Sequence, residues 1–211
     1  YRRLSGDREG MVASAGVSVI MRYTLRLLTV QQFQRAAALI CSCEIIRRRE
    51  DRLGDEPYRI GLWVGDKTAP NRFSGSKKAV EDLKSRGYTD GGSPVQLLSC
   101  PRCGEELAND RGVPNGAAYT IDTTAQRTLV LCQNFKCEMN QKKSGGEGVP
   151  VIVVDEELYR TCPSIIIATV DKFARMPFEG RTQALFGIRD RYSPTLGHIT
   201  PADGDKPGGK K

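Results

Sequence analysis

The fold is decided by residues 17–49, which read VSVIMRYTLRLLTVQQFQRAAALICSCEIIRRR. Residues 17–28 are apolar and rich in β-branched or long side chains, which predicts a buried strand that ends near Leu28. Thr29 is then the predicted N-cap of a helix over residues 31–49. Four apolar residues recur at helical spacing in that helix: Phe33, Ala36, Ala37 and Ile40. A strand that leads directly into a helix is therefore expected.

The same order recurs further along the chain. Residues 59–65 (RIGLWVG) predict a second strand, and residues 76–86 predict a charged amphipathic helix. Residues 149–154 and 164–168 predict two more short strands, and a helix is expected from Thr169. Alternation of strands and helices favours an α/β fold built on a parallel sheet.

Composition limits the class of protein. The chain has 211 residues, of which 39% are hydrophobic and 27% charged, so it can form at least one packed core. Its longest apolar runs fall short of the roughly 18 to 20 residues of a membrane span, and nothing in the sequence resembles a secretion leader. We therefore expect a cytoplasmic protein without a membrane partner. The formal net charge of +7 favours nucleic acid weakly.

Four cysteines give the sharpest chemical signal. Cys100-Pro-Arg-Cys103-Gly is followed by Cys132-Gln-Asn-Phe-Lys-Cys137, so two pairs of thiols stand on separate short turns. Such pairs can close a tetrahedral Zn²⁺ site, and four sulfur ligands leave no open position for catalysis. Proline stiffens the first turn, and the glycine permits a positive φ. Residues 118–122 and 128–131 can form the hairpin of a zinc ribbon, so structural zinc is favoured over unrelated thiols.

The other three cysteines lack such a pattern. Cys41 and Cys43 are two residues apart on a predicted helix, so they point roughly 200° apart and cannot hold one ion together. Core packing is the expected role of both. Cys162 has no sequence context that would activate its thiol.

Two segments resemble nucleotide-binding motifs without meeting their requirements. Gly65-Asp-Lys67-Thr68 follows a predicted strand, but the lysine is not adjacent to the glycine as a P-loop requires. Residues 151–157 (VIVVDEE) deliver an acidic pair at the end of a strand, as a Mg²⁺-binding motif does. Without a P-loop in this chain, a helix-capping or surface role for Asp155 and Glu156 is favoured.

Blocks in the same order over residues 16–190 resemble the helicase subunit of DISARM-type anti-phage systems, a group within the superfamily 2 helicases. The blocks are residues 21–36 (MRYTLRLLTVQQFQRA), residues 58–65 (YRIGLWVG) with Pro70-Asn71, the Cys-Pro-x-Cys-Gly segment, and residues 163–174 (PSIIIATVDKFA). The resemblance implies a partial RecA-like motor domain, lying between the P-loop and the DExH box, with an inserted zinc ribbon. ATP and Mg²⁺ would then belong only to the full-length parent, because this chain lacks both motifs and should be inactive alone. Other subunits of the defence system are implied as partners.

The resemblance also implies a set of nucleic-acid contacts at strand-to-helix junctions. A helix N-terminus offers free N–H groups and a positive dipole end to a phosphate, and ligands gather at the carboxyl ends of parallel strands. DNA is the expected partner, without sequence-specific readout. Simple N-capping by the two threonines is the alternative. The implied contacts are Thr29, Gln31, Gln32, Arg35, Gly65, Thr169 and Lys172, with Arg175 a weaker candidate.

The expected organisation follows from these motifs. Residues 142–148 (KKSGGEG) predict a flexible connector, Trp63 should lie in the core, and His198 should be solvated. The expected segments are a disordered or truncated start (1–16), a first RecA-like part (17–93), the zinc-ribbon insert (94–141), a second RecA-like part (142–190) and a flexible tail (191–211). Two other functions compete with a helicase segment: a zinc-ribbon adaptor that binds protein partners without enzymatic activity, and a thiol oxidoreductase.

Overall fold

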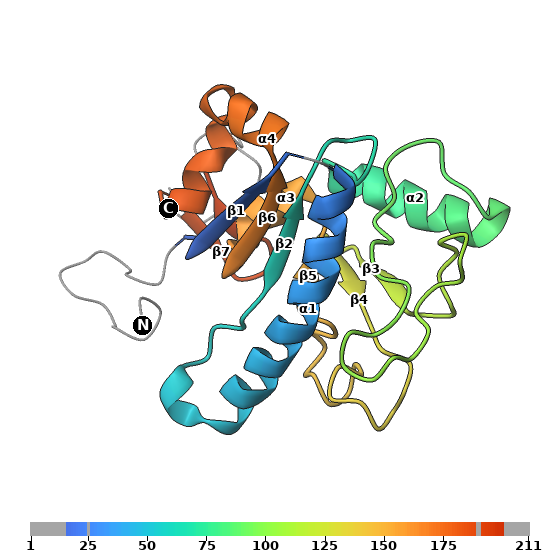
Figure 1. Cartoon of the computed structure of the whole chain (residues 1–211). Helices are drawn as coiled ribbons and strands as arrows, with labels where there is room; N and C mark the ends of the chain where they lie inside the picture. Colours follow the sequence, from blue (N-terminus) through green and yellow to red (C-terminus); the bar gives the residue numbers. More distant parts are fainter. Residues whose placement is uncertain (1–15, 25, 189–190, 201–211) are drawn as a thin grey trace.

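A parallel sheet forms the centre of the molecule, as the alternation of strands and helices predicts (Figure 1). The computed structural model describes residues 16–24, 26–188 and 191–200. Within them, the sheet has four strands in the order β1-β6-β2-β5, and every neighbouring pair is parallel. The strands are β1 (Val19–Tyr23), β6 (Ile165–Thr169), β2 (Ile60–Trp63) and β5 (Val151–Ile152).

Two hydrophobic clusters cover the two faces of this sheet. On one face, Ile60 and Leu62 of β2 pack with Phe33 and Ala37 of helix α1 (Arg26–Arg49). On the other face, Trp63 lies with residues of helix α3 (Asp155–Thr161) and of a 3-10 helix over Gly180–Phe186. Trp63 is 1% exposed, which confirms its core position. The remaining helices are α2 (Phe73–Arg86), α4 (Val170–Arg175) and two 3-10 turns, Asp51–Leu53 and Met176–Phe178.

The first strand and helix differ from the prediction at their junction. β1 ends at Tyr23 and α1 begins at Arg26, so the strand does not reach Leu28 and Thr29 is not the N-cap. Thr29 lies inside the first turns of α1 and is fully buried. Residues 17–28 were predicted as one buried strand because they are mostly apolar. The last three of them belong to α1, and Leu27 there is 71% exposed.

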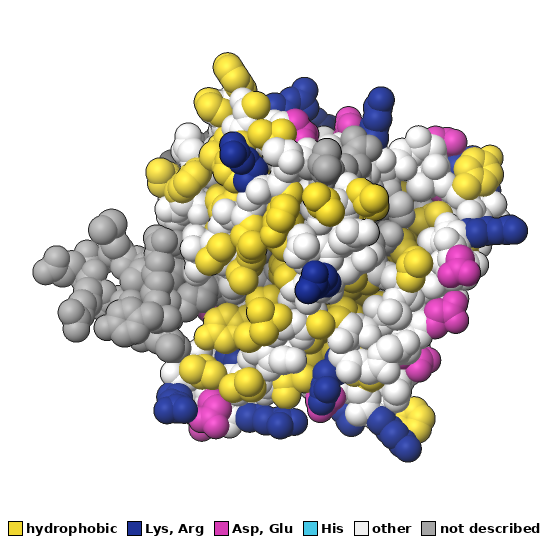
Figure 2. All heavy atoms as spheres, in the orientation of Figure 1, with side chains coloured by type: hydrophobic (Ala, Val, Ile, Leu, Met, Phe, Trp, Pro, Cys, Tyr) yellow, Lys and Arg dark blue, Asp and Glu magenta, His cyan; other side chains and the backbone are white. Residues whose placement is uncertain are grey.

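β1 lies at the edge of the sheet and is not a buried strand. Val19 is 44% exposed and Met21 is 40% exposed. Within the described residues, β6 is its only strand neighbour. Figure 2 shows hydrophobic side chains gathered over the region where Figure 1 places β1 and the start of α1.

Residues 94–141 form irregular turns around a small hairpin. β3 (Tyr119–Asp122) pairs antiparallel with β4 (Arg127–Val130), which confirms the predicted hairpin. This segment shares its hydrophobic core with α1. Three of its residues, Leu97, Leu107 and Met139, belong to the same cluster as Phe33.

The expected connector, residues 142–148, makes specific contacts. Glu147 forms ion pairs with Arg59 at 2.8 Å and with Arg127 at 3.0 Å. Ser144 is buried, and its hydroxyl accepts a hydrogen bond from the Gly148 N–H at 2.8 Å. These contacts fix the segment against the sheet and the hairpin.

The end of the described chain also carries structure. β7 (Arg191–Ser193) and β8 (Gly197–Ile199) form an antiparallel hairpin, and β8 packs against α3. The predicted flexible tail is therefore wrong for residues 191–200, and residues 201–211 lie outside the described residues, as do residues 1–15. His198 is partly buried, with its ring centroid 5.1 Å from that of Tyr192. In the part of the chain that is described, no helix has both the length and the hydrophobicity to cross a membrane.

Candidate metal centre and nucleic-acid interface

The four paired cysteines converge on one point. Their sulfur atoms all lie within 4.8 Å of one another. The Cys100 and Cys137 sulfurs are 3.9 Å apart, and those of Cys103 and Cys132 are 3.5 Å apart. A tetrahedral Zn²⁺ ion with Zn–S bonds of about 2.3 Å separates its sulfurs by roughly 3.8 Å, so the observed spacings fit such an ion. The four thiols could therefore coordinate a metal ion.

The backbone around the sulfurs supports this arrangement. Gly104 has φ of 79°, as predicted for the glycine after the second cysteine, and its N–H donates to the Cys100 carbonyl at 2.9 Å. The Met139 N–H donates to the Cys137 sulfur at 3.4 Å. Burial raises the pKa of Cys100 to about 11, so binding of a cation there must displace a proton from that thiol.

The cysteines outside this cluster have other environments. Cys41 is fully buried, and its pKa is raised to about 12, first by burial and then by the nearby Cys100 and Cys137. This environment confirms core packing for Cys41, whereas Cys43 is only partly buried. Cys162 is buried, and its thiol donates to the Ala184 carbonyl at 3.1 Å, which gives it no access to a substrate.

The carboxyl ends of the strands bring several predicted nucleic-acid contacts to one edge of the sheet. Tyr23 and Thr169 are register partners at the ends of β1 and β6, and Trp63 pairs with Ala168 at the end of β2. Gly65 lies two residues after the end of β2, and a Cβ placed on it would lie 3.8 Å from the Asp171 carboxylate at the start of α4. The start of α1, the Gly65 loop and the start of α4 therefore share this edge.

The two threonines at these junctions are not surface groups. Thr169 occupies the N-cap position of α4 and is 4% exposed, but its hydroxyl makes no capping bond. Among the described residues, this buried hydroxyl has no hydrogen-bond partner. Thr29 is buried within α1, so its side chain contributes to the packing of the helix and does not lie on the surface. Of the predicted contacts on α1, Gln31 and Arg35 are exposed and Gln32 is partly exposed.

Lys172 is turned inward. It is 6% exposed, and its ammonium group donates to the Asp155 carboxylate and to the Asn71 side-chain oxygen, the latter at 3.1 Å. Burial raises the pKa of Asp155 to about 6, although Lys172 acts in the opposite direction. Lys172 therefore neutralises a buried carboxylate, and the predicted surface or capping role of Asp155 is wrong.

Glu156 does cap a helix, but not its own. Its carboxylate accepts a hydrogen bond from the N–H of Phe73, the first residue of α2, at 2.8 Å. This bond satisfies one of the free amides at the start of α2. Sequence reasoning found the capping role, and the structure shows that the capped helix lies more than 80 positions earlier in the chain.

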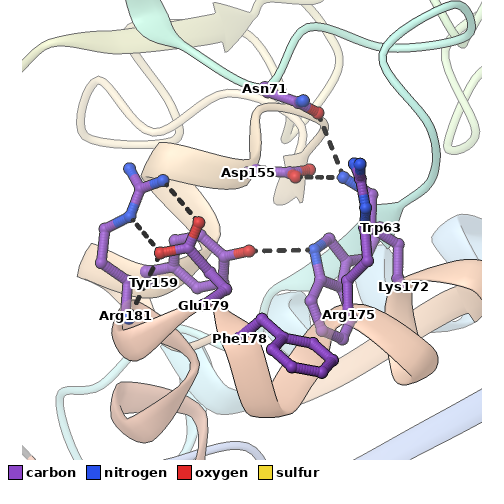
Figure 3. Close-up of a pocket in the computed structure, with 9 residues that line it drawn as sticks. All are labelled: Trp63, Asn71, Asp155, Tyr159, Lys172, Arg175, Phe178, Glu179 and Arg181. Atoms are coloured by element: carbon purple, nitrogen blue, oxygen red, sulfur yellow. Dashed lines mark hydrogen bonds and ion pairs between the residues drawn. The ribbon is translucent and has the colours of Figure 1, made fainter. Parts of the chain in front are cut away.

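A pocket of about 380 Å³ opens beside the Lys172–Asp155 pair (Figure 3). The Trp63 indole N–H donates to the Tyr159 hydroxyl at 3.2 Å on its floor. Sequence reasoning missed this pocket because its walls come from four separate segments. The lining residues are Trp63, Asn71, Asp155, Tyr159, Lys172, Arg175, Phe178, Glu179 and Arg181.

The comparisons with known proteins agree with the resemblance at a coarse level. No protein-family model matches the chain. The chain is 33% identical over 216 aligned residues to DISARM protein DrmA of Bacillus paralicheniformis. That alignment covers 98% of this chain but only 18% of DrmA, so the chain spans about a fifth of this relative's length. Over nearly its whole length, the chain is therefore related to one part of a DISARM protein.

Proposed function

We propose that this chain is a nucleic-acid-binding segment of an ATP-driven, superfamily 2 type DNA translocase in anti-phage defence. The observation that carries the proposal is the shared edge of the parallel sheet, where the start of α1, the Gly65 loop and the start of α4 come together. Ligands of open α/β sheets bind outside the carboxyl ends of the strands. The similarity to a DISARM protein supports the defence role.

The contacts of this segment are with the nucleic-acid backbone. α1 has 24 residues, and its free N–H groups give the shared edge a positive dipole end. Gln31 and Arg35 add an exposed donor and an exposed cation on the same helix. Gly65 allows the backbone to approach a phosphate closely. The buried Lys172 braces the loop after β2 against α3 and α4 through Asn71 and Asp155.

Zn²⁺ is the proposed occupant of the cysteine cluster. Four thiolates at tetrahedral spacing are typical of structural zinc sites, and no ligand position is left for a substrate. The metal would stabilise residues 94–141, which contain only a short hairpin as regular structure in the described chain. ATP and Mg²⁺ are assigned to the longer protein, which we propose acts in the cytoplasm with other subunits of the defence system.

Binding of single-stranded DNA tests the proposal. The 211-residue chain is titrated against a fluorescein-labelled oligothymidylate, and anisotropy is followed between about 50 and 200 mM salt. Each phosphate contact contributes about −0.7 to the slope of log K against log salt for a single strand. Arg35→Gln should weaken binding and make the slope shallower by about that amount. Arg52→Gln, in the 3-10 turn that follows the far end of α1, is the matched control.

Two results would contradict the proposal. Absence of salt-dependent binding to DNA removes the nucleic-acid role, and salt-insensitive capture of a protein partner in its place would favour the adaptor function. Equal effects of Arg35→Gln and Arg52→Gln on affinity would show that DNA does not bind specifically at the sheet edge.

A further inference from the structure

We propose that the pocket beside the Lys172–Asp155 pair receives one unstacked nucleobase of the bound strand. This inference rests on the proposed function and adds a base-binding site to its backbone contacts. The pocket lies beside the start of α4, so a strand on the shared edge of the sheet passes its mouth. Its volume of about 380 Å³ is in the range of small-molecule sites.

The floor of the pocket offers a fixed hydrogen-bond acceptor. Asp155 is 5% exposed, and one carboxylate oxygen binds Lys172 while the other, Oδ1, accepts no hydrogen bond of normal geometry from the described residues. Burial raises the pKa of this carboxyl and the nearby Trp63 indole N–H acts against that rise, but this N–H donates its hydrogen bond to the Tyr159 hydroxyl at 3.2 Å. Figure 3 shows this carboxylate extending between Asn71 and Trp63. A buried acceptor without a partner is costly, and a ligand N–H group would satisfy it. Adenine, cytosine, guanine and thymine each carry such a donor, so the site accepts every base.

The rim of the pocket offers an aromatic surface. Phe178 is 88% exposed, and it lies at the end of the 3-10 turn Met176–Phe178, in which Pro177 fixes the backbone. A solvent-exposed aromatic ring on a rigid turn can stack on a base with little loss of conformational entropy. Stacking on aromatic side chains is sequence-tolerant and is a main source of affinity for single strands.

The remaining walls match the rest of a nucleotide. Arg175 is exposed at the pocket and can reach a flanking phosphate. Arg181 is held by Glu179 at 2.8 Å, and its guanidinium lies 5.3 Å from the centre of the Tyr159 ring. This held pair forms the wall opposite Lys172, as Figure 3 shows. The pocket therefore combines an acceptor, a stacking ring and a cation.

An oligonucleotide without bases separates this site from backbone binding. The chain is titrated with a 12-nucleotide oligothymidylate and with an abasic strand of the same length and charge. Trp63 is the one tryptophan of the sequence and lines the pocket, so its fluorescence reports occupancy directly. We expect the oligothymidylate to bind roughly tenfold more tightly and to change the Trp63 emission, which the abasic strand should leave unchanged.

Two variants complete the test. Phe178→Ala removes an exposed ring, so the fold should persist, and it should erase most of the preference for the strand with bases. Phe135→Ala removes another exposed ring, 75% accessible, from the cysteine-bearing segment and should keep the preference. Equal, salt-dependent affinity for both strands would overturn the base pocket alone, whereas binding of neither strand would overturn the proposed function as well.

Discussion

Gly61 and Gly65 stand four positions apart but have different surroundings. A Cβ on Gly61 would lie 2.1 Å from the Leu158 side chain, in the packed interface between β2 and α3. A Cβ on Gly65 would meet nothing closer than 3.8 Å. The first glycine is required by packing. The second has room for a side chain, so packing within the described chain does not explain it.

Gly65→Ala should therefore separate binding from stability. We expect the free energy of unfolding to change by less than about 1 kcal/mol, because the added methyl group makes only an ordinary van der Waals contact, with the Asp171 carboxylate. Affinity for single-stranded DNA should fall severalfold if a phosphate approaches this backbone. Urea unfolding and anisotropy titration measure the two effects.

Gly61→Ala is the matched variant, with an expected loss of roughly 1 to 3 kcal/mol from overpacking. Unchanged DNA affinity in Gly65→Ala would remove Gly65 from the interface.

At the scale of elements, a network of charges connects the hairpin to the sheet. Arg127 of β4 binds Glu147 and also Glu157 of α3, the second at 3.0 Å. Glu147 reaches in turn to Arg59, directly before β2. Burial would raise the pKa of Glu147, but the Arg127 and Arg59 guanidinium groups outweigh it and hold the pKa at about 2.

Acid should break this network and destabilise the fold. Because the folded-state pKa of Glu147 lies below its unfolded value near 4.3, its stabilisation is complete above about pH 5 and is lost as the pH falls toward 2. Glu147→Gln should lower the free energy of unfolding at pH 7 by on the order of 1 to 3 kcal/mol. It should also flatten the loss of stability between pH 5 and pH 2, measured by urea unfolding at each pH.

Glu81→Gln serves as the control, since Glu81 is an exposed side chain of α2 outside the network. A variant at Glu147 with the acid dependence of the unsubstituted protein would show that the network contributes little.

The cysteine-bearing segment should depend on its metal. After purification under reducing conditions we expect about one equivalent of Zn²⁺ per chain by elemental analysis, and less than half an equivalent in Cys132→Ser. A chelator should lower the melting temperature of the unsubstituted protein. Cys43→Ser, outside the cluster, should retain the metal. Full zinc content in Cys132→Ser would contradict a four-sulfur site.

Regular, local patterns were predictable at this scale. Residues 76–86 predicted most of α2, and Gly87 ends that helix with φ of 78°. The cysteine spacing predicted which four sulfurs would meet. The strand predicted over residues 149–154 was too long, because only Val151–Ile152 pairs with β2. The ends of such strands depend on pairing between segments that are distant in the chain, and local sequence patterns do not reveal that pairing.

At the scale of the whole molecule, β1 forms an edge of the sheet with no second strand neighbour among the described residues. β1 exposes Val19 and Met21, and a strand edge left unpaired by the described part of the chain can offer its N–H and C=O groups to another strand. Met21→Lys should raise the concentration at which the protein self-associates, because a charge on an edge strand opposes pairing. Static light scattering against concentration measures the effect.

Leu39→Lys is the control, since Leu39 is 61% exposed on α1 and its replacement removes apolar surface without altering the edge. If both variants raised the concentration required for self-association equally, loss of exposed apolar surface, and not the strand edge, would explain the effect.

The candidate site shows where sequence reasoning ends. Thr29 and Thr169 were expected at one edge of the sheet, because each was predicted to stand between a strand and a helix. The structure places Thr169 at such a junction, whereas Thr29 is buried inside α1. The burial of Lys172 was not predictable, because its partners Asp155 and Asn71 lie 17 and 101 positions away. The local sequence around a lysine is the same whether its side chain is exposed or forms a buried ion pair.

The core that Phe33 shares with Leu97, Leu107 and Met139 has a practical consequence for anyone who dissects this protein. Excision of residues 94–141 would expose the apolar side chains of α1 that pack against this segment. The excised segment would likewise expose the apolar side chains that α1 covers. Grafting the cysteine module onto another scaffold would require a replacement for that helix. The insert and the sheet should thus be expressed, purified and mutated as one unit.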